Sequence, residues 1–247
     1  MISTMARIKG QRRSIGGLDA IEILAEGAVE SRETPTIILL HGFGADMNDL
    51  ASLAEVIQAP AGTRWIFPNA PLTVPLGGHY EGRAWYPLSI SDLQKAAVGK
   101  PEDNTLIPKG FDRATSEVLE LISALDVDPK KLVIGGFSQG AMVATDVALR
   151  LPQPSAGLVM LSSTFLNEVQ WTQLASVLAQ KVLPRKFMFF QSHGSRDPVL
   201  SINSAVRLEK MLLSAGWGGQ LLRFSGGHEI PPEVLRQLSG YLRRVLS

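Results

Sequence analysis

The chain has 247 residues, of which 45% are hydrophobic and 19% are charged, a balance that excludes a disordered chain and a polycation. Its 24 basic and 23 acidic residues leave a net charge of +1, which favours a small neutral partner over nucleic acid or an anionic membrane surface. The absence of cysteine excludes a disulfide framework, a thiolate zinc site and a cysteine nucleophile.

The length fits a single domain spanning residues 1–247, with residues 1–17 as an N-terminal arm. Acidic residues from Asp19 onward interrupt the apolar core that a signal peptide needs. The longest apolar runs are far shorter than the ~18 residues that cross a bilayer. We therefore expect a cytoplasmic protein with no integral membrane association.

Short apolar runs alternate with longer segments of helical period, which is typical of a parallel sheet covered by helices. The expected strands are Thr36 to Leu40, Arg64 to Phe67, Lys131 to Gly135, Gly157 to Ser162, Lys186 to Gln191 and Gln220 to Phe224. The expected helices are Asn48 to Gln58, Gly110 to Leu125, Gln139 to Leu151, Glu168 to Gln180, Ser201 to Ala215 and Pro232 to Leu246. Residues 18–26 are expected to add antiparallel edge strands. The sequence thus predicts an α/β fold with a mostly parallel central sheet and helices on both faces.

Residues 68–108 form a segment rich in proline and glycine with little periodicity. An aperiodic stretch of this length in a compact domain is usually a functional loop. We expect it to lie beside the active site.

A serine lies where a ligand is expected, beyond the carboxyl end of a parallel strand. Ser138 belongs to Gly136-Phe137-Ser138-Gln139-Gly140, which matches the G-x-S-x-G turn that projects a nucleophilic hydroxyl. A side chain at either glycine would collide with the neighbouring strand or helix in so sharp a turn. The pattern, with an apolar strand before it and a helical segment after it, predicts that Ser138 is a nucleophile.

A serine nucleophile needs a neighbouring base that is itself oriented by an acid. His228 lies in a glycine-rich loop after the last expected strand, and Asp197 follows the strand before it. The order Ser138, Asp197, His228 is the one expected for this type of turn.

Alternatives to this triad remain open at the level of sequence. Ser138, Glu168 and His193 keep the same chain order, although Glu168 is typical of a first helical turn, where the helix dipole stabilises an acid. Asp197 precedes a proline and also fits a turn or helix cap, and His228 also fits a loop histidine. His193 fits a structural role in holding the loop that presents Asp197.

Backbone N–H groups are the expected donors for a tetrahedral oxyanion. Gln139, directly after the nucleophile, supplies one donor, and the Phe43 N–H in His41-Gly42-Phe43-Gly44 is the expected second donor. His41 is expected to shape this loop. No second ligand at helical spacing supports a metal role for it.

With these residues in place, the sequence resembles the phospholipase/carboxylesterase family of α/β-hydrolases, which includes acyl-protein thioesterases and small bacterial carboxylesterases. The resemblance runs from about Pro35 to Val245. Its blocks are Leu39 to Asp46 with Asn48-Asp49-Leu50, Phe67 to Pro71, Arg83 to Tyr86, Gly135 to Ala141, His193-Gly194 with Asp197, and Gly227 to Pro231. The chain departs from many members at Ala141, where they have a glycine, and in its N-terminal arm.

The resemblance implies a serine esterase that forms an acyl-enzyme without a cofactor or a metal. Its triad maps onto Ser138, Asp197 and His228, and its oxyanion donors onto Phe43 and Gln139. The aromatic pair Trp85 and Tyr86 is expected to line one wall of the acyl pocket.

The expected substrates are short- to medium-chain carboxylic esters. An acyl-protein thioesterase or a lysophospholipase is the alternative enzyme. A silent hydrolase-fold binding protein is the non-enzyme alternative, disfavoured because all three triad positions carry competent residues. The sequence leaves a homodimer open.

Overall fold

The computed structural model describes residues 10–24, 30–88, 107–181 and 186–247. Eight strands form one sheet in the order β1-β2-β4-β3-β7-β8-β9-β10. Six neighbouring strands run parallel: β4 (Arg64–Pro68), β3 (Thr36–Leu40), β7 (Leu132–Phe137), β8 (Gly157–Leu161), β9 (Met188–Gly194) and β10 (Gly218–Phe224). At the β4 edge, β2 (Leu18–Leu24) and β1 (Gly10–Ile15) add an antiparallel hairpin. The predicted mostly parallel central sheet is confirmed.

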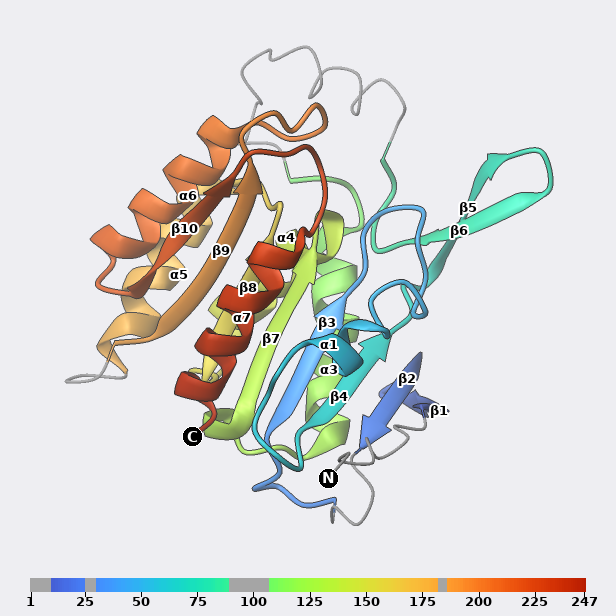
Figure 1. Ribbon diagram of the computed structural model, residues 1–247, viewed down its shortest axis with the longest axis horizontal. Helices are drawn as coiled ribbons and strands as arrows, with labels where there is room; N and C mark the ends of the chain where they lie inside the picture. Colours follow the sequence, from blue (N-terminus) through green and yellow to red (C-terminus); the bar gives the residue numbers. More distant parts are fainter. Residues whose placement is uncertain (1–9, 25–29, 89–106, 182–185) are drawn as a thin grey trace, which may run out of the picture.

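Helices cover both faces of the sheet (Figure 1). One face packs against α3 (Phe111–Leu125), α4 (Gln139–Arg150), α5 (Glu168–Gln180) and α6 (Ile202–Ser214), which contribute to the larger core cluster. The other face packs against α1 (Leu53–Val56) and α7 (Pro232–Val245), which contribute to a second core cluster. A short 3-10 turn, η1 (Pro129–Lys131), precedes β7. The carboxyl ends of the parallel strands therefore meet at one edge of a sheet that is buried on both sides.

Most predicted elements agree with the structure to within a few residues at their ends. The strand β3 and the helix α5 have the predicted bounds. The strand β9 is an exception, because it continues through His193 and Gly194, which pair with Arg223 and Phe224 of β10. The sequence placed these two residues after the strand, where they resembled the start of a loop.

The helix predicted from Asn48 to Gln58 is much shorter than expected. Only α1 (Leu53–Val56) is helical. The preceding residues form consecutive turns whose N–H groups bond three residues back, as in Asp49 N–H to Asp46 O at 3.1 Å. The Asp46 carboxylate also accepts the Asn48 N–H at 2.8 Å. A local side-chain acceptor of this kind competes with regular helical bonding.

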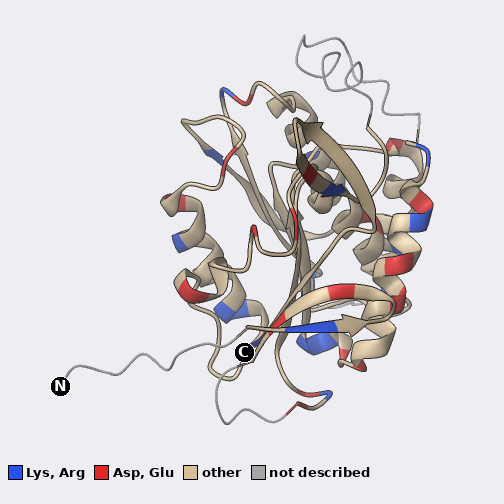
Figure 2. Ribbon diagram, turned by 90° about the vertical axis from the view of Figure 1, so that its right-hand side faces the viewer, with Lys and Arg blue, Asp and Glu red and all other residues tan. Residues whose placement is uncertain are grey.

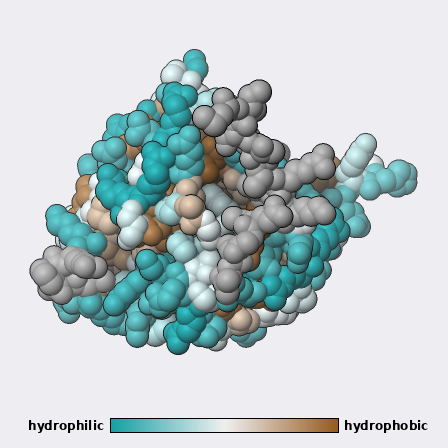
Figure 3. Space-filling view, turned by 60° about the horizontal axis from the view of Figure 1, so that its bottom comes forward, coloured by the Kyte–Doolittle hydropathy of each residue, from teal (hydrophilic) through white to brown (hydrophobic). Residues whose placement is uncertain are grey.

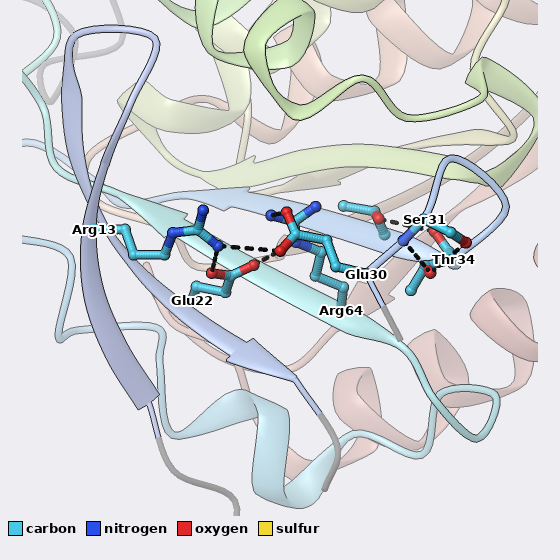
Figure 4. Close-up of polar contacts among 7 residues, drawn as sticks. Arg13, Glu22, Glu30, Ser31, Thr34 and Arg64 are labelled. Atoms are coloured by element: carbon cyan, nitrogen blue, oxygen red, sulfur yellow. Dashed lines mark hydrogen bonds and ion pairs between the residues drawn. The ribbon is translucent and has the colours of Figure 1, made fainter. Parts of the chain in front are cut away.

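The N-terminal arm differs from the expectation, because its residues 10–15 form β1 and pair with β2. An ion cluster centred on the buried side chains of Glu22 and Arg64 joins this hairpin to the central sheet (Figure 4). Glu22 of β2 accepts Arg64 Nε of β4 at 2.5 Å and Arg13 Nη1 of β1 at 2.5 Å. Glu30 also accepts from Arg64, at 2.7 Å. The Arg64 side chain is only 2% exposed, so these partners offset the cost of burying its charge.

The segment 68–108 contains more regular structure than its composition indicates. The strands β5 (Leu72–Gly77) and β6 (Tyr80–Ala84) form an antiparallel hairpin, which extends from the body of the domain in Figure 1. Gly77 and Gly78 have φ values of 102° and 60°, which suit the turn that joins the two strands. Residues 89–106 of the predicted loop lie outside the described residues.

The surface of the described residues carries mixed charge. Acidic and basic residues alternate along the helices visible in Figure 2. The face drawn in Figure 3 is mainly hydrophilic, with small, separated hydrophobic areas. Across the described ranges, no helix has the length and hydropathy needed to span a membrane.

Candidate active site

Ser138 lies at the junction between β7 and α4, at the carboxyl edge of the sheet. Its φ of 53° and ψ of −120° depart from ordinary helix and strand values. Its N–H donates to Leu161 O at the end of β8, at 2.9 Å. A strained backbone at this position projects the hydroxyl away from the sheet, as the G-x-S-x-G pattern predicts.

The two glycines of the turn allow β3 to approach the start of α4. A Cβ at Gly140 would lie 2.2 Å from Leu40 O and 2.5 Å from His41 O. A Cβ at Gly136 would lie 2.6 Å from the Gly140 carbonyl carbon and 2.6 Å from Leu40 O. The predicted collisions at both positions are therefore confirmed.

Asp197 and His228 are brought together from the loops after β9 and β10. His228 Nδ1 lies 2.7 Å from Asp197 Oδ2. The other carboxylate oxygen accepts the backbone N–H groups of Val199 at 2.8 Å and Leu200 at 3.0 Å. Burial alone would raise the pKa of Asp197, but the hydrogen bonds from His228, Leu200 and Val199 outweigh it and hold that pKa below its ordinary value.

An ionised Asp197 can only accept, so His228 Nδ1 carries a proton, and in the neutral ring the lone pair therefore lies on His228 Nε2. The His228 ring lies beside the nucleophile turn, with its centroid 4.8 Å from that of Phe137. Within the described part of the chain, no hydrogen bond joins Ser138 Oγ to His228 Nε2. Such bonds are often long in the absence of substrate and shorten in the Michaelis complex.

The loops that carry Asp197 and His228 are held to each other by backbone contacts. A Cβ at Gly194 would lie 2.1 Å from Gly227 O, so the glycine permits this approach. The Arg196 N–H donates to Gly226 O at 2.9 Å. The relative position of the acid and the base is therefore fixed by main-chain atoms.

The contacts of the rival acid favour Asp197 as the partner of the base. Glu168 lies in the first turn of α5 and pairs with Arg207 Nη2 at 2.9 Å. His193 Nε2 contacts Leu200 O at 3.0 Å and Asp197 Oδ2 at 3.4 Å. Because a carbonyl can only accept, His193 Nε2 carries a proton that also faces the Asp197 carboxylate. His193 thus holds the acid loop, which is the structural role that its place in the sequence suggested.

The loop expected to supply the second oxyanion donor lies against the nucleophile turn. A Cβ at Gly42 would be 3.2 Å from the Phe137 ring and 3.5 Å from Ser138 Cβ. Phe43 follows directly, and its N–H and that of Gln139 have no acceptor among the described residues. Two backbone donors are therefore available beside Ser138.

Trp85 and Tyr86, which were expected to line one wall of the acyl pocket, are each only 1% exposed and belong to the larger core cluster. The Tyr86 hydroxyl contacts Met142 Sδ at 3.0 Å. Large aromatic side chains stabilise a core by the apolar area that they bury, and a sequence in a loop does not reveal this burial. Both side chains pack beneath the site.

Sequence reasoning missed the hydrogen bonds of the Gln139 side chain. Its Oε1 accepts the Trp85 N–H at 2.9 Å, and its Nε2 donates to Tyr86 O at 2.8 Å. No signal in the sequence indicated this contact, because the partners are main-chain atoms. Among the described residues, no group of His, Cys, Asp and Glu side chains could hold a metal ion.

Comparison with known proteins identifies the family of this chain. A sequence model of the phospholipase/carboxylesterase family matches residues 24–246. The chain belongs to this family. The resemblance inferred from its motifs is thereby confirmed, and the protein is a serine hydrolase with the α/β-hydrolase fold.

Relatives in this family include acyl-protein thioesterases. Acyl-protein thioesterase 1 of Mycosarcoma maydis is 28% identical over 238 residues, which cover 87% of this chain and 92% of that protein. Acyl-protein thioesterase 1 of Saccharomyces cerevisiae is 27% identical over 226 residues, which cover 86% and 93%. Among solved structures, esterase PE8 has a TM-score of 0.66 at 24% identity, covering 97% of this chain and 99% of that chain. SOBER1 of Arabidopsis thaliana has a TM-score of 0.68 at 20% identity, covering 87% and 100%. These two structures share the fold with this member of the phospholipase/carboxylesterase family.

Proposed function

We propose that this protein is a serine carboxylesterase that hydrolyses short- to medium-chain carboxylic esters through an acyl-enzyme. The observation that carries the proposal is the 2.7 Å contact between His228 Nδ1 and the buried Asp197 carboxylate, beside a serine in a strained turn. This contact leaves His228 Nε2 able to accept a proton, which is the requirement for activating Ser138.

In the proposed reaction, Ser138 Oγ attacks the acyl carbonyl carbon and its proton passes to His228 Nε2. The Phe43 and Gln139 N–H groups donate to the oxyanion that forms. Collapse of the tetrahedral intermediate breaks the bond to the alcohol, which takes the proton from His228. A water then attacks the acyl carbonyl carbon while His228 Nε2 takes its proton. The bond to Ser138 Oγ breaks, His228 returns the proton to Ser138, and the acid is released.

The surroundings of the donor loop support an apolar acyl group. Leu76 of β5 lies against Gly44, where a Cβ would be 3.1 Å from Leu76 Cδ2. The Gly44 N–H also donates to Arg83 O of β6 at 2.8 Å. An apolar side chain here favours acyl methylenes by about 0.8 kcal/mol each where they are buried.

A second candidate is an acyl thioesterase, which the names of the two relatives support. The same triad chemistry serves both substrates, because a thiolate leaves from the tetrahedral intermediate as an alkoxide does. The nature of the leaving group therefore has to be measured.

The test is labelling by a fluorophosphonate together with a substrate profile. We expect the probe to modify one residue, Ser138. The variant Ser138→Ala should not be labelled, and its turnover should fall by several orders of magnitude. Labelling at another residue, or undiminished turnover in Ser138→Ala, would overturn the assignment. The profile compares p-nitrophenyl esters of increasing chain length with acyl thioesters and lysophospholipids. A higher kcat/KM for thioesters would favour the second candidate.

A further inference from the structure

The two proposed oxyanion donors lie on segments that are distant in the sequence, and a buried network of hydrogen bonds connects these segments. Gln139 follows the nucleophile at the start of α4, whereas Phe43 lies in the loop after β3. Transition-state stabilisation depends on the position of both N–H groups, and a displacement of about 1 Å costs roughly 10²-fold in rate. The contacts that fix this spacing therefore bear on catalysis.

The first part of the network is the side-chain amide of Gln139, which is 1% exposed. It bonds to the backbone of two consecutive residues, accepting from the Trp85 N–H at 2.9 Å and donating to Tyr86 O at 2.8 Å. The donor and the acceptor of the amide are thus both used, which fixes its orientation. The start of α4 is held to the segment after β6.

The second part is the Trp85 indole, whose Nε1–H donates to His41 O at 2.9 Å. His41 Nε2 accepts the Ala70 N–H at 3.1 Å, so the ring proton lies on Nδ1, which donates to Gly42 O at 2.7 Å. Burial lowers the pKa of His41 and keeps the ring neutral. The peptide that carries the Phe43 N–H begins at this same Gly42 carbonyl.

We propose that Trp85, His41 and the Gln139 side chain form an oxyanion brace that sets the spacing of the Phe43 and Gln139 N–H groups. The inference rests on the proposed function. Trp85 and the Gln139 amide are positioning residues, because they act on the donors through hydrogen bonds and do not contact the reacting atoms. Trp85 is therefore expected to affect the rate for every acyl chain, instead of selecting among chains.

The burial of Trp85 separates this role from that of an acyl-pocket wall. The side chain is 1% exposed, its ring centroid lies 5.5 Å from that of His41, and its single indole donor is used within the protein. A substrate contact would have required exposed ring surface. The brace accounts for both hydrogen bonds that Trp85 donates, one from its backbone and one from its indole.

The test compares Trp85→Phe with Trp217→Phe. Trp217 is a matched control, because it is also 1% exposed and its Nε1–H donates to one backbone carbonyl, Ala175 O, at 3.0 Å. Both changes shrink a buried ring and remove an indole N–H that donates to a backbone carbonyl. We expect Trp85→Phe to lower kcat roughly ten- to hundred-fold by the same factor for acetate, butyrate and octanoate esters. KM and the acidic limb of the pH profile should stay unchanged. Trp217→Phe should keep kcat within about two-fold of the wild type.

Gln139→Met is a second variant that removes the amide but keeps the backbone N–H. It should reproduce the loss in kcat, and the double variant with Trp85→Phe should lose little more than either alone, because both changes break one network. A Trp85→Phe variant as active as Trp217→Phe would overturn the brace, as would a loss that grows with acyl chain length. If the fluorophosphonate fails to label wild-type Ser138, the proposed function fails first. Normal labelling of the wild type with undiminished activity in both variants refutes only the brace.

Discussion

The change Gly140→Ala should show how closely β3 must approach α4 for catalysis. The added Cβ would lie 2.2 Å from Leu40 O and 2.5 Å from His41 O, and both obstacles are backbone atoms that cannot rotate away. To restore a contact of at least 3 Å, the start of α4 and the end of β3 must separate by about 1 Å. Such a displacement between nucleophile and donor loop costs about 10²-fold in kcat.

The stability of this variant involves two opposed terms. Alanine favours the helix by about 1 kcal/mol over glycine, whereas overpacking costs about 1–3 kcal/mol. We therefore expect a net loss in the free energy of unfolding of about 0–2 kcal/mol. The matched control is Gly240→Ala in α7, where a Cβ meets no atom within 4 Å. This control should gain up to about 1 kcal/mol and keep full activity.

The assay combines kcat for p-nitrophenyl acetate with urea unfolding of the two variants and the wild type. Wild-type kcat in Gly140→Ala would refute the argument, because the clash would then relax without moving the site. A similar loss of kcat in Gly240→Ala would show that any added methyl in a helix is harmful.

Three further predictions concern the buried carboxylates of Asp197 and Glu22. Asp197→Asn should lower kcat by about 10⁴-fold, because the Val199 and Leu200 N–H groups would hold the amide oxygen and leave the NH2, which cannot accept, facing His228 Nδ1. Glu168→Gln should stay within about two-fold, and similar losses in the two variants would favour the rival triad. The folded-state pKa of Asp197 lies below its ordinary value, so its carboxylate stabilises the fold at neutral pH and this contribution is lost as the pH falls. The free energy of unfolding of Asp197→Asn should therefore depend less on pH in the acid range than that of the wild type. Glu22→Gln should lower the free energy of unfolding by about 3 kcal/mol, because it weakens the pairing of buried Arg64. The Arg13 side chain is 43% exposed, so Arg13→Ala should lower the free energy of unfolding by less than about 1 kcal/mol. Equal costs in urea unfolding would contradict this ranking.

The parallel strands could be predicted from the sequence because a strand covered on both faces is a short, continuous apolar run. Thr36–Leu40 is such a run, and all five of its residues are buried. The β5–β6 hairpin could not be predicted in the same way. Leu72, Val74 and Leu76 do alternate with other residues in β5, but Pro75 interrupts the pattern and argues against a strand, and both strands of the hairpin are mostly exposed. A local hydrophobic pattern indicates which residues are buried, and few residues of this hairpin are buried.

The buried side of β2 shows a second limit. The alternation of Ile21 and Ile23 indicated an edge strand, but the opposite face of β2 also buries Ala20 and Glu22. Glu22 is only 6% exposed because Arg64 of β4 meets it. A buried charge becomes predictable only when its partner is known, and this partner lies on another strand.

The candidate triad could be predicted because each of its residues follows a strand at the same edge of the sheet. The role of Gln139 could not, because its side chain bonds to the main-chain N–H of Trp85 and the main-chain carbonyl of Tyr86. Any residue except proline offers the same N–H, and every residue offers the same carbonyl. The residue type of the partner therefore gives no indication of a contact of this type.

The two interpretations of Asp197 that the sequence left open are compatible, because they use different oxygens. Oδ1 accepts the N–H groups of Val199 and Leu200, which is the turn-capping role suggested by the Asp-Pro pair. Pro198 has no N–H and a fixed φ, so the next two N–H groups fold back onto this oxygen. Oδ2 is left for His228. The turn thus orients the carboxylate toward the histidine, so the capping motif that looked like an alternative to a catalytic role is compatible with the proposed one and supports it.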